Sequence, residues 1–138
     1  MIKLTDEMRE KIGNALDDGF PVVTSSVNPD GQPTISFYGS TQVFSSDQLA
    51  VWVRSREEGL VTRIPHNPRM AFLYRNTTER LGWQIHGRAR LVDDPAIAQQ
   101  IYDNAPQRER DSDSEQQGSA VIIDVDRVIA RGQVLMER

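Results

Sequence analysis

The strongest constraint on the fold is a series of short segments in which apolar and polar residues alternate. Starting at Pro21 they are "PVVTSSV", "TISFYGSTQVF" (34–44), "LAVWVRS" (49–55), "MAFLYRN" (70–76), "LGWQIHGRARLV" (81–92) and "SAVIIDVDRVIARGQ" (119–133). A period of two is typical of strands that bury one face. The turn sequence "NPDG" separates the first two segments, as expected for a hairpin. The pattern therefore predicts six antiparallel strands.

Helices are predicted at only a few places. Apolar residues recur every four positions near the N-terminus and predict a helix over about 5–18: Leu4, Met8, Ile12 and Leu16. Asp94 followed by Pro95 predicts the start of a second helix, and a short one is expected over 57–64. The charged segment 103–118 has almost no apolar side chain and predicts a mobile surface loop. The fold class is thus mainly β: a single domain over 1–138, a six-stranded antiparallel barrel with peripheral helices.

Composition excludes several classes of function. The chain has 138 residues, no cysteine and a formal net charge of -4. Thiolate nucleophiles, disulfides and zinc–thiolate sites are therefore excluded, and an acidic chain is not expected to bind nucleic acid. No apolar run is long enough to span a bilayer, and the N-terminus lacks the pattern of a secretory signal. We expect a cytoplasmic protein with no membrane partner.

Alternation also divides the strands into a core face and a polar face. Ile35 and Phe37 are expected in the core, together with Leu49, Val51 and Val53. The opposite faces then present polar, cationic and aromatic side chains: Ser36, Tyr38, Ser40, Gln42, Trp52, Arg54, Arg56, Gln84, His86, Arg88 and Arg90. Such a surface suits a polar ligand.

Cations are concentrated after the third predicted strand, at Arg54, Arg56 and Arg63, with Ser55 between the first two. Guanidinium and hydroxyl groups at the start of a helix are well suited to hold a phosphate. Two simpler interpretations remain open. The arginines can pair with the glutamates at 57 and 58, and Ser55 can cap the helix.

The order of these elements, together with "HNPRMAFLY" and "WQIHGRARLVDDP", resembles the pyridoxamine-phosphate-oxidase-like family of flavin-binding split barrels. The similarity covers roughly residues 8–132. It implies a homodimer with two cofactor sites in clefts between the barrels. FMN is the commonest cofactor of the family, and other branches bind a deazaflavin or haem.

The resemblance also implies roles for individual residues. The phosphate-holding segment of the family falls on Arg54, Ser55 and Arg56, with Arg63 as a further candidate. The strand backbone around Val53 and 37–40 would lie against the flavin ring. On the polar face, the side chains of Ser36, Tyr38 and Trp52 would contact the cofactor. His86 would contact the substrate or bind a haem.

The chain departs from the family pattern in two respects. Many relatives have a basic residue about eight positions before the proline of the NP pair, where this chain has Leu60. True pyridoxamine phosphate oxidases have basic residues at positions that are Ser36 and Thr41 here, so oxidation of vitamin B6 is not expected. The leading hypothesis is an FMN-dependent oxidoreductase acting on a small organic substrate. A deazaflavin-dependent reductase of the same fold and a non-catalytic flavin- or haem-binding dimeric module are the alternatives, and Leu60 favours the module.

Overall fold

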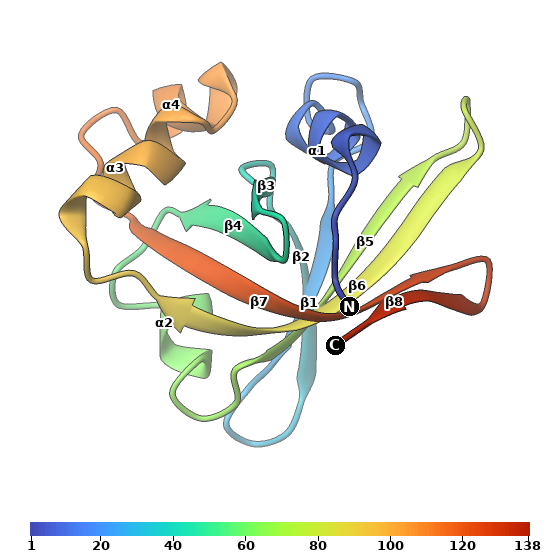
Figure 1. Cartoon of the computed structure of the whole chain (residues 1–138). Helices are drawn as coiled ribbons and strands as arrows, with labels where there is room; N and C mark the ends of the chain where they lie inside the picture. Colours follow the sequence, from blue (N-terminus) through green and yellow to red (C-terminus); the bar gives the residue numbers. More distant parts are fainter.

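An antiparallel sheet of eight strands forms most of the protein, which a computed structural model describes over residues 1–138 (Figure 1). The strands are β1 Val23–Val27, β2 Pro33–Phe37, β3 Gln42–Ser45, β4 Gln48–Val53, β5 Arg69–Asn76, β6 Leu81–Leu91, β7 Ser119–Ala130 and β8 Gln133–Glu137. The helices are α1 Asp6–Gly13, α2 Leu60–Arg63, α3 Pro95–Asp103 and α4 Gln107–Ser112. None of them is long and apolar enough to cross a bilayer.

The strand order is β2-β1-β5-β6-β7-β4-β3, and β8 pairs with β7. The mainly β, antiparallel fold class is confirmed. The sheet has eight strands, however, where we expected six, and it is not a closed barrel, because β2 and β3 do not pair. The second predicted strand divides at a turn in which the Thr41 amide donates to the Tyr38 carbonyl at 3.1 Å. The last predicted strand divides at Arg131 and Gly132, which both have positive φ.

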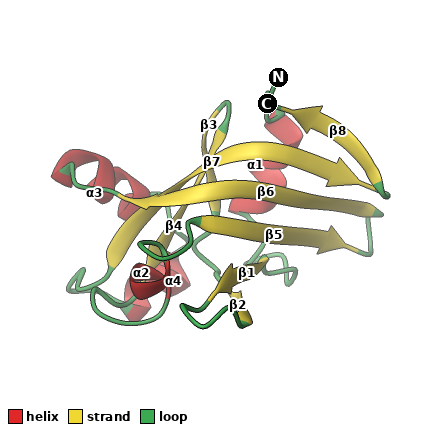
Figure 2. Cartoon of the chain, turned by 90° about the horizontal axis from the view of Figure 1, so that it is seen from below, coloured by secondary structure: helices red, strands yellow, loops and turns green.

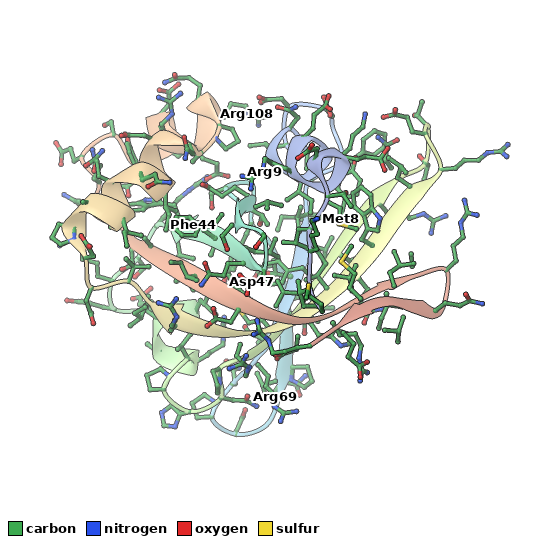
Figure 3. The ribbon with its side chains drawn as sticks, viewed as in Figure 1. Met8, Arg9, Phe44, Asp47, Arg69 and Arg108 are labelled. Atoms are coloured by element: carbon green, nitrogen blue, oxygen red, sulfur yellow. The ribbon has the colours of Figure 1, made fainter.

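The main core lies between the concave face of the sheet and α1. Met8 and Ile12 of α1 point into it, and Figure 3 shows Met8 between the helix and the sheet. Thr5 caps α1 by accepting a hydrogen bond from the Met8 amide at 3.1 Å. The helix ends at Gly13, so the prediction of helix to about residue 18 is too long; residues 14–19 form turns.

A second, smaller apolar cluster lies on the opposite face of β4 and β7, beneath α3. Trp52 and Tyr102 meet there edge to face, with ring centroids 5.1 Å apart. Asp94 caps α3 by accepting from the Ala96 amide at 2.9 Å, and Pro95 is its first residue, which confirms that helix. Consequently β4 is buried on both faces, and Trp52 does not lie on an exposed polar face.

The predicted orientation of β2 is wrong. Ile35 and Phe37 are 76% and 68% exposed. Ser36 is instead paired with the buried Thr24 of β1, and paired residues of antiparallel strands share a face. Alternation defines two faces without saying which one is buried, so both choices satisfied the pattern.

The segment 103–118 also differs from the prediction, since Gln107–Ser112 forms helix α4 where we expected irregular loop. Tyr102 and Trp52 are among the residues whose polar contacts hold the segment to the rest of the protein. The Tyr102 hydroxyl donates to the carbonyl oxygens of Arg110 and Asp113 at 3.1 and 3.0 Å. The Trp52 indole donates to the Asp113 carboxylate at 2.8 Å. Hydrogen bonds to backbone groups and one acidic side chain fix this path, and hydropathy does not report them.

Candidate functional site

Five of the predicted cofactor residues line one hollow between the ends of β2 and β4. Its volume is about 350 Å³, and its predicted lining residues are Ser36, Tyr38, Trp52, Val53 and Arg54. The residues that complete it are Phe37, Gly39, Ser40 and Glu109. Glu109 comes from α4, which lies next to the end of β4 in Figure 2. The structure therefore brings most of the predicted set together, and adds a carboxylate to it.

Ser40 fixes the floor of this hollow. Its hydroxyl donates to the Trp52 carbonyl and accepts from the Trp52 amide, both at 2.8 Å. The buried Ser40 side chain thus replaces the two backbone hydrogen bonds that a paired strand would make, and it holds the turn after β2 against β4. The side-chain amide of Gln42 donates to the Ile101 carbonyl at 3.1 Å, so Gln42, which we predicted on the polar face, also has a structural role.

Arg54 and Glu109 form the rim. The guanidinium donates to the carboxylate at 3.0 Å, with the arginine side chain 57% exposed and that of the glutamate 12% exposed. Glu109 also lies directly against the Cα of Gly39, where a β-carbon would collide with its carboxylate. Glu109 is the one acidic residue in the lining, and nothing in its local sequence connects it with β2 or β4. Sequence reasoning could not find it.

Arg63 lies close to Tyr38 but does not line the hollow. It donates to the side-chain oxygens of Asn28 and Ser26 at 2.8 and 3.4 Å, and no carboxylate pairs with it. Burial raises the pKa of Tyr38 above its ordinary value of 10.0, and the charge of Arg63 offsets part of that increase. The phenol therefore stays protonated at neutral pH and can donate a hydrogen bond into the hollow.

Arg56 and Ser55 also lie outside the hollow. Arg56 donates to the carbonyl oxygens of Gly118 and Gln116 at 3.1 and 2.9 Å. Ser55 accepts from the amides of Glu57 and Glu58 at 3.1 and 3.0 Å, which caps a turn and not α2. Helix α2 begins only at Leu60, whose side chain is buried, so the expected helix over 57–64 is shorter than predicted.

Asp113 is a second residue that sequence reasoning missed. Burial acts to raise its pKa, but the Gln117 and Gly118 amides and the Trp52 indole all donate to the carboxylate, and the net pKa is lowered. Gly118 lies so close to β4 that a β-carbon there would collide with the Val53 carbonyl. The end of the segment is therefore fitted against the strand that forms the hollow.

His86 lies in a different place, on β6, in a separate hollow of about 590 Å³. Its Nε2 atom is 2.6 Å from the Gln84 side-chain oxygen. Arg88 in the same hollow pairs with Asp126 at 2.9 Å, and this hydrogen bond is the main cause of the lowered Asp126 pKa. Within a single chain, His86 is thus not brought to the predicted cofactor residues.

Comparison with known proteins identifies the family and supports the fold. The family model described as pyridoxamine 5'-phosphate oxidase matches residues 5–131. The chain belongs to this family. Among curated proteins, none matches the sequence.

Solved structures share the fold at low sequence identity. HupZ from Group A Streptococcus has a TM-score of 0.67 at 18% identity, covering 91% of each chain. A pyridoxamine 5'-phosphate oxidase-related, FMN binding protein from Nostoc punctiforme has a TM-score of 0.70 at 11% identity, covering 93% of this chain and 84% of the other. An FMN-binding protein from Syntrophomonas wolfei has a TM-score of 0.59 at 9% identity, covering 89% and 85%. These likenesses establish the fold.

Proposed function

We propose that the protein binds FMN in the hollow between β2 and β4 and acts as a flavin-dependent oxidoreductase on a small organic substrate. One observation carries the proposal: residues chosen from the sequence as flavin contacts, among them Ser36, Tyr38 and Arg54, line a single hollow. Membership of the pyridoxamine 5'-phosphate oxidase family and the two FMN-binding structural neighbours support the choice of cofactor.

The available groups fit a phosphorylated flavin. The hollow of about 350 Å³ falls within the usual range of small-molecule sites, roughly 300–1,000 Å³. The hydroxyls of Tyr38 and Ser36 offer hydrogen bonds in the hollow. Arg63 does not line the hollow, but it lies next to Tyr38 and no carboxylate neutralises it, so it is the cation that we propose for the phosphate. Arg54 becomes available only when Glu109 releases it, and Arg56 is held by backbone carbonyls.

When bound, FMN supplies hydride transfer, and the protein supplies position, polarity and exclusion of water. Val53 and Trp52 provide buried walls, and the Ser40 bridge to β4 keeps the two strand ends at a fixed separation. No side chain in the hollow is needed as an acid or base for this step. The substrate would approach from the open side.

The expected homodimer is also a proposal. Ile35, Phe37 and Leu73 are exposed on one face, where Val23 of β1 is paired with both Phe37 and Leu73. A continuous apolar row of this kind on the outer side of a sheet suits contact with a second copy. Trp52 is covered by α3, so it is not part of this proposed face.

Titration with FMN and with riboflavin tests the cofactor proposal. Arg63→Gln removes the unpaired cation, so FMN affinity should fall about 10- to 100-fold, the effect of losing a hydrogen bond to a charged group of ~1.5–3 kcal/mol. Riboflavin has no phosphate, so its affinity should change little. Arg108→Gln, an exposed arginine on α4 that makes no side-chain hydrogen bond, is the matched control. A parent protein that binds neither flavin would refute the proposal.

A non-catalytic module remains the second candidate, and two residues favour it. Leu60, at the position where many relatives are basic, has its side chain buried, and Glu109 puts a carboxylate where an anion would bind. FMN-loaded protein whose flavin is reduced by a chemical reductant, but is not reoxidised faster by any candidate substrate, would support the module. Reoxidation that depends on substrate would support the enzyme.

A further inference from the structure

The outer face of the sheet continues from the apolar row of the proposed dimer onto β6, where His86 lies. Strand pairing places Ile35 opposite Ser25, and Ser25 opposite Ala71. Ala71 is in turn paired with the half-buried His86, and paired residues of antiparallel strands share a face. These four side chains therefore form one row across β2, β1, β5 and β6, which follow one another in the sheet (Figure 2).

A dimer interface of ordinary size reaches His86. Three strand spacings of about 4.8 Å separate it from Ile35, or roughly 14 Å. A standard interface covers about 800 Å² of each partner, which is a patch roughly 32 Å across. A patch of that width over the exposed side chains of Ile35, Phe37 and Leu73 extends to the end of the row. The histidine then lies where the apolar part of the interface meets its polar rim.

The surroundings of His86 are cationic. The hollow beside it is lined by four arginines and two carboxylates, which come from β5, β6, β7 and β8: Arg69, Arg88, Asp126, Arg127, Glu137 and Arg138. The residues that β1 contributes, Ser25 and Val27, are uncharged. Both carboxylates are already paired, Asp126 with Arg88 at 2.9 Å and Glu137 with Arg127 at 3.0 Å. No negative charge is left for another cation.

The neutral imidazole suits this position better than the charged form does. Its Nε2 atom is 2.6 Å from the Gln84 side-chain oxygen. When Nε2 donates this hydrogen bond, the proton that charges the ring is added at Nδ1, for which the chain provides no acceptor. The new charge lies beside Arg69 and Arg88. Two-fold symmetry brings the same groups from the second copy, so protonation adds two unpaired charges to one interface, where like charges repel.

We propose that His86 makes the association of two copies depend on pH: the dimer forms while the imidazole is neutral and is weakened when the imidazole is protonated. The proposal rests on the homodimer proposed above and does not depend on the flavin. Histidine changes its charge between about pH 5 and pH 8. The dimer binds fewer protons than two separate copies do, so its stability rises with pH. Each excluded proton changes the dissociation constant about tenfold per pH unit, and two copies give a limit of about 100-fold.

The net charge of the chain predicts the opposite dependence on pH. The chain has a net charge of -4 and an isoelectric point of about 5.1, so acidification from neutral pH reduces its net charge. A smaller net charge weakens the repulsion between copies and favours association. Dissociation on acidification therefore requires a specific group. The other histidine, His66, is exposed before β5 and does not line the hollow.

The experiment is sedimentation equilibrium of the full chain at about pH 7.5 and about pH 6, with ionic strength and flavin content held constant. The dissociation constant of the dimer should be at least about tenfold higher at the lower pH. Near-UV circular dichroism at both pH values checks that the fold is kept. An equal or lower dissociation constant at the lower pH overturns the proposal. A parent that is monomeric at both pH values overturns the homodimer itself, and this proposal with it.

Three variants identify the group. His86→Gln keeps a hydrogen-bond donor but cannot be charged, so its dimer should match that of the parent at the higher pH and lose most of the pH dependence. His86→Arg is always charged, so its dissociation constant at the higher pH should be at least about tenfold above that of the parent. His66→Gln, the matched control, should keep the full pH dependence. The proposal is also overturned if His86→Gln keeps the pH dependence of the parent, or if His66→Gln abolishes it.

Discussion

Replacing Glu109 by glutamine is the perturbation that most directly tests the flavin hollow. The carboxylate is largely buried, pairs with Arg54 at 3.0 Å and is the one negative charge in the lining. A flavin phosphate adds nearly two further negative charges close to it. Glu109→Gln keeps the shape and the ability to accept a hydrogen bond, and it removes only the charge. FMN affinity should therefore rise.

The structure sets bounds on the size of the gain. If Glu109 swings out of the hollow, binding costs the parent at most the Arg54 ion pair, about 1 kcal/mol for a pair whose arginine side chain is 57% exposed, or about fivefold in affinity. If it stays in place, two unit charges about 4 Å apart repel by roughly 4 kcal/mol at an effective dielectric constant of about 20, or nearly a thousandfold. The expected gain lies between these limits. Folding stability should fall by no more than ~1 kcal/mol.

The assay is flavin fluorescence titration at fixed low salt, with FMN and riboflavin. Riboflavin affinity should change less than twofold, because it adds no charge. Glu115→Gln, an exposed carboxylate in the same segment, changes the net charge equally and should leave both affinities unchanged. If Glu109→Gln binds FMN no more tightly than the parent does, the phosphate lies elsewhere and our reasoning about the rim is wrong.

Three further outcomes are expected from the packing. Gly118→Ala should destabilise the fold by about 1–3 kcal/mol in thermal melts, because the added β-carbon collides with β4, whereas Gly13→Ala, with open space around it, should not destabilise. The pKa of Asp113 is lowered in the fold, so this carboxylate stabilises the fold at pH values above its ordinary pKa of 3.8, and the stabilisation is lost as the pH falls below that value. In acid titrations, Asp113→Asn should lose part of this pH dependence of stability. Phe37→Asp should turn the proposed dimer into a monomer in sedimentation, and an unchanged dimer would exclude the β2 face.

The elements that the sequence predicted well depend on local signals. Helix α3 follows from Asp94 and Pro95, which act within one turn of the helix. The first hairpin follows from its NPDG turn, and Gly31 adopts the expected positive φ. Leu49 and Val51 are fully buried as the alternation indicates. In each case the deciding contacts lie within a few residues of one another.

The parts that were missed depend on contacts between distant segments. Arg56 looks like a phosphate ligand in the sequence, yet its guanidinium is held by carbonyl oxygens 60 and 62 residues away. The break between β2 and β3 is marked only by Gly39 and Ser40 inside an otherwise continuous alternation. The face that β2 buries depends on its pairing with β1. Composition and periodicity contain no information on any of these partners.

The 103–118 segment explains how a site with a carboxylate in it can still admit an anion. Its C-terminal half is fixed by Arg56, by the Trp52 indole on Asp113 and by the close contact of Gly118 with β4. At the hollow itself the only polar side-chain contact of α4 is the exposed ion pair between Glu109 and Arg54. Opening the hollow therefore requires rotation of one glutamate side chain, not displacement of the segment. For this reason a point substitution at Glu109, and not deletion of 103–118, separates phosphate binding from folding.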